Sequence, residues 1–234
     1  MKVIAVVGSA SGSGKTTLAC ALLRAIPGLG AVKISPSDGA ARVEWGPGKT
    51  GKDTARFAGC GAAAVARIVA PRERFPETWE TVRAVFEPLP GVLIEGAGAL
   101  ALPEDRFTIF VAVPDTLGER PARDERLAAA ADCIVVVRAA GDTADEHPLV
   151  ARHRGRVPVF GIRPDAVEWG NESLIEAVRS FLFGEEGAPA SIPLTSPFPK
   201  GGESEDPSID PLTPPLQNGD VGRLMRMDPQ AKDD

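Results

Sequence analysis

The chain contains few of the residues that build a disulfide framework or a zinc site. Its 234 residues include three cysteines and two histidines, and no two cysteines form a Cys-x-x-Cys pair. Isolated cysteines of this kind are typical of small buried thiols in a reducing compartment. No apolar run is long enough to span a bilayer, and no secretion signal is visible at the start. We therefore expect a cytoplasmic protein that does not insert into a membrane.

The chain also lacks an excess of positive charge. Its net charge is −6 and its isoelectric point is about 5.1, which gives no electrostatic footprint for nucleic acid or for an anionic membrane surface. The charge is concentrated in residues 185–234, which hold ten acidic and four basic residues and nine of the 22 prolines. Such a segment buries too little apolar surface to offset its ordering entropy. We predict one domain over residues 1–184 and a disordered acidic tail over residues 185–234.

A glycine-rich motif stands near the start of the chain. Residues 8–17 read GSASGSGKTT, after the apolar residues 3–7 and before the helix-prone residues 18–26. In a P-loop, main-chain N–H groups and a helix N-terminus hold phosphates, a lysine reaches the β- and γ-phosphates, and a hydroxyl binds Mg²⁺. The motif predicts a site for ATP or GTP with Mg²⁺, formed by Gly12, Ser13, Gly14, Lys15, Thr16 and Thr17.

The spacing of this motif departs from the usual P-loop. Gly8 and Gly14 enclose five residues instead of four, and Ser9 stands where the first glycine is expected. Either the turn begins differently or the loop is one residue longer. A second Gly-Lys-Thr string, at residues 48–50, follows Pro47 with no strand before it, and this context favours an exposed basic loop.

Apolar β-rich runs alternate with helix-prone segments along residues 1–184. The alternation predicts an α/β fold of the P-loop NTPase kind, with a mainly parallel sheet covered by helices on both faces. Residues 40–53 are rich in glycine and charge and are predicted to form a long loop, and residues 54–69 are predicted to begin as a helix and to become extended near residues 66–70. Further strands are expected at residues 3–7, 30–34, 91–95, 107–113, 133–137 and 157–162, and further helices at residues 18–26, 76–86, 121–131 and 172–183.

The second half of the site is expected at the carboxyl ends of the strands, where ligands bind in such sheets. Glu95 ends an apolar strand and can hold Mg²⁺ or polarise a water molecule, so Lys15 and Glu95 are the predicted catalytic pair. The predicted metal residues are Thr16, Glu95 and Asp38, although an aspartate before glycine is also an ordinary turn residue. Lys33 is a candidate second phosphate contact, and Asp53 is interpreted as a helix cap. Residues 138–142 and 162–165 are candidates for base contacts by position alone.

Three segments resemble the molybdopterin-guanine dinucleotide biosynthesis protein B (MobB) family. They are SGSGKTTL at residues 11–18, GKDTARFAGCGAA at residues 51–63 and VLIEG at residues 92–96. The resemblance implies a small P-loop protein that binds GTP and assists guanine nucleotide attachment to molybdopterin. A molybdenum cofactor guanylyltransferase-type protein is then the implied partner, hydrolysis is expected to be slow, and a homodimer is left open.

Other segments resemble dethiobiotin synthetase and the cobyrinic acid synthetases. Those families have a G-x-x-x-G-x-G-K-T loop with the same five-residue gap, and a Glu-Gly-Ala-Gly string similar to residues 95–98. This alternative implies an ATP-dependent ligase-type enzyme that activates a small carboxylate by phosphoryl transfer. The GKDTARFAGCGAA match favours the first resemblance.

Overall fold

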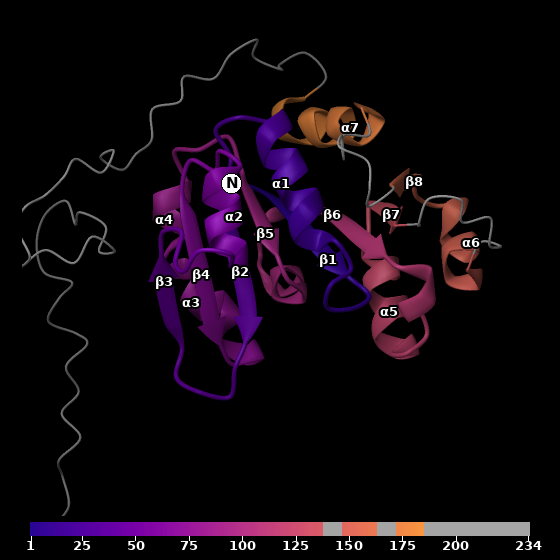
Figure 1. The fold of residues 1–234 in the computed structure, drawn as a ribbon, viewed down its shortest axis with the longest axis horizontal. Helices are drawn as coiled ribbons and strands as arrows, with labels where there is room; N and C mark the ends of the chain where they lie inside the picture. The colour runs from indigo at the N-terminus through magenta and orange to yellow at the C-terminus, as the bar shows by residue number, and fades with distance from the viewer. Residues whose placement is uncertain (138–146, 163–171, 185–234) are drawn as a thin grey trace, which may run out of the picture.

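A computed structural model describes residues 1–137, 147–162 and 172–184. Its centre is an eight-stranded sheet in the order β3-β4-β2-β5-β1-β6-β7-β8, shown in Figure 1. Every pairing between neighbours is parallel except β3 with β4, which is antiparallel. The strands are β1 (Lys2–Gly8), β2 (Gly30–Pro36), β3 (Arg42–Trp45), β4 (Val65–Ala70), β5 (Val92–Glu95), β6 (Asp105–Ala112), β7 (Cys133–Val137) and β8 (Val159–Ile162).

Seven α-helices and three short 3₁₀ turns connect these strands in the described residues. The helices are α1 (Lys15–Ala25), α2 (Asp53–Gly59), α3 (Phe75–Glu80), α4 (Arg83–Phe86), α5 (Pro121–Ala129), α6 (Pro148–Arg154) and α7 (Glu172–Phe183). The 3₁₀ turns are η1 (Arg72–Arg74), η2 (Ala97–Ala101) and η3 (Pro114–Thr116). None of these helices has both the length and the apolar character that crossing a bilayer requires.

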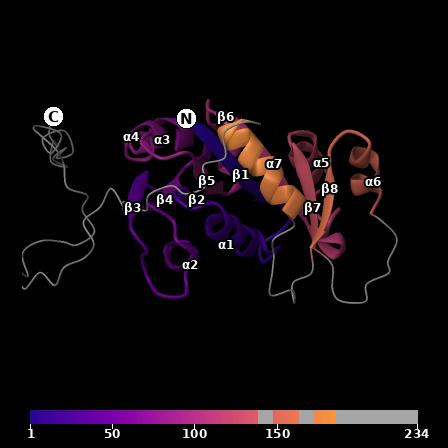
Figure 2. The same cartoon turned by 90° about the horizontal axis from the view of Figure 1, so that it is seen from above.

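The apolar core lies on both faces of the sheet. Side chains of α1, α2 and α7 pack on one face, around Ile4 and Val6 of β1. On the other face, α3 and α4 cover the half that contains β2 and β4, and α5 and α6 cover the half that contains β6 and β7. Figure 2 shows α1 and α2 on the opposite side of the sheet from α3 and α4. Because successive side chains of a strand point to opposite faces, β1 contributes to both halves of the core, and the predicted α/β fold is confirmed.

Two predicted segments have a different structure. Residues 40–53 were expected to be a loop, but they contain β3, which adds an antiparallel edge to the sheet. Here Arg42 and Glu44 face solvent and Val43 and Trp45 pack against the core, so the segment is a short amphipathic strand. The predicted helix over residues 76–86 is divided into α3 and α4, and Thr81 lies at the break with its hydroxyl donating to the Thr78 carbonyl.

Some expectations concern parts of the chain that the structure leaves undescribed. The predicted acidic tail over residues 185–234 lies outside the described residues, as do the candidate base contacts at residues 138–142 and 163–165. The predicted strand over residues 133–137 and the predicted helix over residues 172–183 are present with the expected bounds, as β7 and α7. The remaining predicted strands and helices are present with shifted ends, and α6 is an additional helix that the sequence did not predict.

Candidate nucleotide-binding site

The loop between β1 and α1 leaves main-chain N–H groups available to an anion. Gly12 and Gly14 have φ values of 77° and 84°, a backbone region that side-chain-bearing residues rarely adopt. Gly14 is the N-cap of α1, and no side chain caps the helix. The first N–H groups of a helix have no partner within the helix, and its N-terminus carries a partial positive charge. The loop and the first turn of α1 therefore have the donors that phosphate binding requires.

The loop is one residue longer than the common P-loop, and Gly8 is its first glycine. A Cβ atom at Gly8 would lie 2.6 Å from Ser13 Oγ and 2.9 Å from Lys15 Cδ, so the loop folds back over Gly8 too closely for a side chain. Ser9 turns away from the loop: its hydroxyl lies 2.9 Å from Thr116 Oγ1 and accepts the Val113 N–H at 3.3 Å. The unusual spacing is thus accommodated by an extra residue at the start of the loop.

Arg123 of α5 binds the main chain at the start of the loop, at Gly8 and Ser9. Its guanidinium donates to the carbonyls of Gly8 at 2.8 Å and of Ser9 at 2.6 Å. Burial lowers the pKa of Arg123, opposed by Asp124 and assisted by nearby arginines. The segment from η3 to α5 thereby fixes the point at which the chain leaves β1.

We expect the variant Arg123→Gln to lose both bonds and to unfold more easily. A hydrogen bond to a charged group contributes about 1.5–3 kcal/mol, and Arg123 is only 28% exposed, so we expect a loss of about 2 kcal/mol. For a domain of this size that corresponds to a melting temperature lower by about 4–8 °C, measured by circular dichroism. Arg126→Gln is the matched control, since it removes an exposed arginine of the same helix. Equal melting temperatures of Arg123→Gln and the unmodified protein would contradict a stabilising role for these two hydrogen bonds.

Lys15 points into the space that the loop surrounds. Its ammonium donates to the Ala10 carbonyl at 2.5 Å and to Ser13 Oγ at 3.0 Å. Burial lowers the pKa of Lys15, and the negative charge of Glu95 opposes this shift. The ammonium thus lies among the acceptors of its own loop, where a phosphate group would offer stronger ones.

Four polar side chains meet beside Lys15, each from a different element. Thr16 is the second residue of α1, Lys33 lies in β2, Asp53 begins α2 and Glu95 ends β5. The Thr16 hydroxyl lies 2.8 Å from Glu95 Oε2 and 3.0 Å from Asp53 Oδ1. The Lys33 ammonium contacts Glu95 Oε1 and lies 2.9 Å from Asp53 Oδ2.

The packing of the sheet explains this convergence. Lys33 and Glu95 are register partners in the parallel β2–β5 pair, and Val6 of β1 is the partner of Glu95 on its other side. Burial would lower the pKa of Lys33, but the two carboxylates outweigh burial and raise it. Burial alone would raise the pKa of Asp53, but Lys33, Thr16 and Arg56 together lower it by more, so the net shift is downward.

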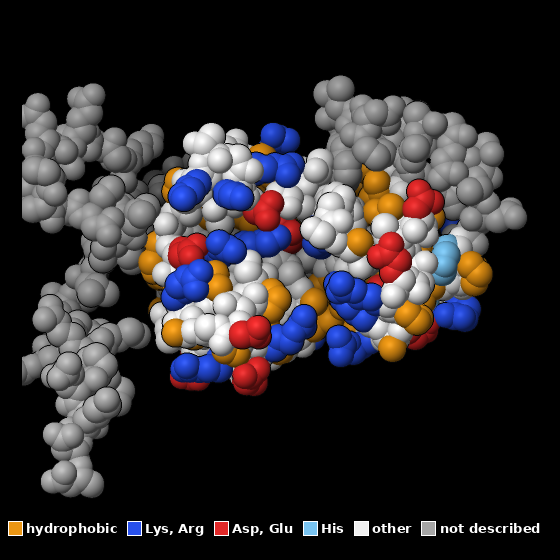
Figure 3. Space-filling model, turned by 60° about the horizontal axis from the view of Figure 1, so that its bottom comes forward, with side chains coloured by type: hydrophobic (Ala, Val, Ile, Leu, Met, Phe, Trp, Pro, Cys, Tyr) orange, Lys and Arg blue, Asp and Glu red, His pale blue; other side chains and the backbone are white. Residues whose placement is uncertain are grey.

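These groups line one cavity of about 280 Å³. Three basic and two acidic side chains line it. Figure 3 shows the molecule with the bottom of Figure 1 turned forward, and lysine and arginine side chains lie on both sides of the centre of the face that it shows. Arg56 of α2 also reaches the loop, donating to Thr17 Oγ1 at 3.2 Å. The lining residues are Ser11, Gly12, Ser13, Gly14, Lys15, Thr16, Thr17, Lys33, Asp53, Arg56 and Glu95.

The structure brings most of the predicted site residues together, but Asp53 lines the cavity in place of Asp38. All six predicted nucleotide-binding residues and Glu95 line the cavity, whereas Asp38 is exposed beyond the end of β2 and does not line it. Asp53, interpreted from the sequence as a helix cap, occupies the position expected of a second acidic group; Lys52 is the N-cap of α2. A signal that could have identified Asp53 is its place in the segment GKDTARFAGCGAA, which carries the family resemblance.

The oxygen atoms beside Thr16 fit Mg²⁺. A hydroxyl and two carboxylates are hard ligands of the kind that magnesium prefers, and an ammonium already lies among them, so the position attracts a cation. Thr16, Asp53 and Glu95 are therefore the residues that would hold the metal.

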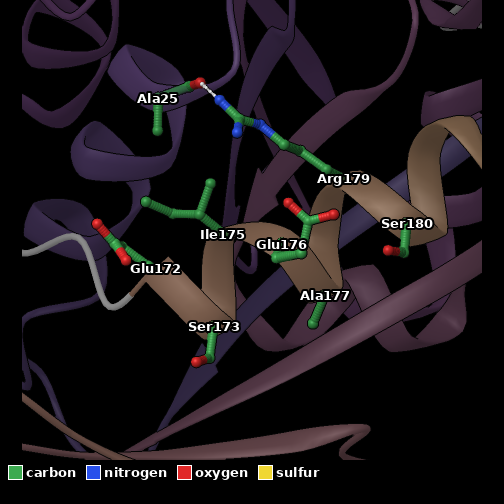
Figure 4. A pocket seen from close by; sticks show the side chains of 8 residues that line it. All are labelled: Ala25, Glu172, Ser173, Ile175, Glu176, Ala177, Arg179 and Ser180. Carbon is green, nitrogen blue, oxygen red and sulfur yellow. Dashed lines mark hydrogen bonds between the residues drawn. The ribbon is translucent and has the colours of Figure 1, made fainter. Parts of the chain in front are cut away.

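A larger hollow lies on α7, at the other end of α1 from Lys15. It measures about 790 Å³ and is lined by Ala25 and seven residues of α7. Figure 4 shows its side chains, with Arg179 donating to the Ala25 carbonyl at 2.9 Å. Two of the lining residues, Glu172 and Glu176, are acidic and only Arg179 is basic, whereas the smaller cavity has three basic side chains and the glycine-rich loop to bind a triphosphate. The smaller cavity is therefore the better candidate site.

No family model matches the chain, and no curated protein matches it. Two solved structures are similar in fold. Hydrogenase maturation factor HypB from Archaeoglobus fulgidus is 17% identical with a TM-score of 0.56, and the match covers 78% of this chain and 90% of that one. HypB from Helicobacter pylori, solved in complex with nickel, is 13% identical with a TM-score of 0.55. This match covers 81% of this chain and 91% of that one. The chain has the P-loop NTPase fold.

Proposed function

We propose that the chain binds a nucleoside triphosphate with Mg²⁺ in the cavity at the start of α1 and hydrolyses it slowly. The observation that carries this proposal is the meeting of Lys15, Thr16, Asp53 and Glu95 around one space lined by the loop. Lys15 would contact the β- and γ-phosphates, and main-chain N–H groups of the loop would surround their oxygens. A bound Mg²⁺ would neutralise negative charge on the phosphate oxygens.

The more specific proposal is a GTP-binding accessory protein similar to MobB. Support comes from the segment GKDTARFAGCGAA, whose Asp53 and Arg56 both line the cavity. One of the two fold neighbours, the protein from Archaeoglobus fulgidus, carries the name hydrogenase maturation factor, and an accessory role for this chain would agree with that name. The partner would be a molybdenum cofactor guanylyltransferase-type protein, and the chain would act in the cytoplasm.

One observation favours the ligase-type alternative as a second candidate. Lys33 adds a second ammonium to the cavity that Lys15 also lines, and two cationic side chains around a γ-phosphate suit transfer of the phosphoryl group to a carboxylate. In that case ATP would be the nucleotide, and turnover would require a small carboxylate or amine as second substrate.

A calorimetric titration of ATP and GTP, each with and without Mg²⁺, tests these proposals. We expect GTP to bind more tightly than ATP, Mg²⁺ to strengthen binding, and hydrolysis to be well below about 1 s⁻¹, which is slow for an enzyme. Preference for ATP, with turnover that appears only when a carboxylate is added, would favour the ligase. Failure of both nucleotides to bind would refute the proposed function.

A further inference from the structure

Lys33 occupies an unusual position for a phosphate-binding lysine. Its ammonium contacts Glu95 Oε1 and lies 2.9 Å from Asp53 Oδ2, so it touches both carboxylates that would hold Mg²⁺. Thr16 Oγ1 touches the other oxygen of each carboxylate. The two carboxylates among the three candidate metal ligands are therefore already paired with one positive charge, and that charge belongs to the chain itself.

The charge balance explains why an ammonium belongs there. The side chain of Glu95 is 1% exposed, and a second carboxylate lies within reach of the same hydroxyl. Two carboxylates so close together, one of them buried, repel each other unless a cation lies between them. Lys33 is well placed for this purpose because the parallel register of β2 and β5 sets it directly beside Glu95.

We propose that Lys33 is an internal counter-ion that occupies the magnesium ligands Asp53 and Glu95 in the nucleotide-free protein, so that a divalent cation binds only together with the nucleotide. This inference rests on the proposed function of the site. A triphosphate would offer the Lys33 ammonium new acceptors in the same cavity, and the lysine side chain has a flexible four-carbon stem with which to reach them. Once the ammonium has moved, both carboxylates are available to the metal.

The proposal implies a thermodynamic coupling between the two ligands. If Lys33 competes with the metal until the nucleotide arrives, the nucleotide must raise the metal affinity, and the metal must raise the nucleotide affinity by the same factor. Couplings of this kind typically amount to about 5- to 150-fold. Removing the ammonium should remove the competition and thereby most of the coupling that it causes.

Binding of Mn²⁺, a paramagnetic substitute for Mg²⁺, to the full chain without nucleotide tests this directly. The free ion is measured by electron paramagnetic resonance in the unmodified protein and in Lys33→Met, which keeps the length of the side chain and removes its charge. We expect Lys33→Met to bind Mn²⁺ at least about tenfold more tightly, within the usual range of such couplings. Lys33→Arg, which retains a cation, should bind Mn²⁺ as weakly as the unmodified protein.

Two further variants show where the gained ion binds. In Lys33→Met combined with Asp53→Asn, the gain should be lost, because one of the two carboxylates is gone. Lys52→Met is the matched control: it removes an exposed lysine adjacent to Asp53 and should change Mn²⁺ affinity by less than about twofold, as expected for an exposed charge. Circular dichroism of each variant verifies that the fold is retained.

The outcomes separate this inference from the proposed function. If Lys33→Met is folded and binds nucleotide but shows no gain in Mn²⁺ affinity without nucleotide, the counter-ion role is refuted and the nucleotide site stands. An equal gain in Lys52→Met would also refute it, since the effect would then be one of net charge. If neither ATP nor GTP binds the unmodified protein with Mg²⁺, the proposed function itself fails.

Discussion

Replacing Lys15 by alanine is expected to weaken triphosphate binding by about 100-fold or more. The ammonium lies inside the loop, 2.5 Å from the Ala10 carbonyl and 3.0 Å from Ser13 Oγ, so it is available to phosphate oxygens in the same space. A hydrogen bond to a charged group contributes about 1.5–3 kcal/mol, and contacts to two phosphates together exceed a factor of about 100. Calorimetric titration of the nucleotide with Mg²⁺ measures the loss.

The fold of Lys15→Ala should be almost unaffected. The two contacts of the ammonium are to its own loop, and burial already disfavours its charge, so the melting temperature should change little. Lys49→Ala is the matched control, because it removes the lysine of the second Gly-Lys-Thr string, which is exposed and does not line the cavity. Unaltered nucleotide affinity in Lys15→Ala, or an equal loss in Lys49→Ala, would contradict the assignment of the site.

The phosphate-binding half of the site could be predicted because it is local in sequence. The loop, the start of α1 and the preceding strand are consecutive, so the order of apolar, glycine-rich and helix-prone residues determines their geometry. Glu95 was predicted for a related reason, since a carboxylate at the end of a buried strand lies at the edge where ligands bind. The fold class likewise followed from alternating strands and helices, whose patterns extend over many residues.

The parts that the sequence did not reveal depend on long-range packing. Asp53 reaches Thr16 across 37 positions of the chain because α2 packs against α1, and Phe57 of α2 is fully buried in the same core cluster as the apolar side chains of α1. Arg123 reaches Ser9 across 114 positions, and no motif marks it. β3 was missed for a different reason: four residues of alternating polarity are too few to be separated from a loop by pattern alone.

Asp38 shows why a strand end alone does not identify a ligand. Asp38 was predicted, like Glu95, from its place near a strand end, but β2 ends at Pro36 and Asp38 lies in an exposed bend beyond it. Glu95 by contrast is the last residue of its strand and is flanked by β1 and β2, which bury it. The position of a carboxylate relative to its neighbouring strands therefore decides whether it faces the cavity, and that position depends on the order of the strands in the sheet.

Glu95→Gln is expected to remove most of the magnesium dependence of nucleotide binding and to reduce hydrolysis by about 100-fold. Glutamine keeps the size of the side chain and can still accept from the Thr16 hydroxyl, but it lacks the negative charge that a hard divalent cation requires. Loss of a residue that only supports a metal ligand typically costs about 10- to 100-fold in metal affinity or activity, so loss of a direct ligand should cost at least as much.

The decisive comparison is the ratio of nucleotide affinities with and without Mg²⁺, measured for Glu95→Gln and for Glu104→Gln. Glu104 is the matched control because its carboxylate is also buried, at 4% exposure, and accepts from the Trp79 indole away from the cavity. A buried carboxylate matters to stability in either place, so both variants should melt at lower temperature, but only Glu95→Gln should lose the magnesium effect. If that effect persists at full strength in Glu95→Gln, Glu95 has no metal role, and Thr16 and Asp53 alone would have to hold the ion.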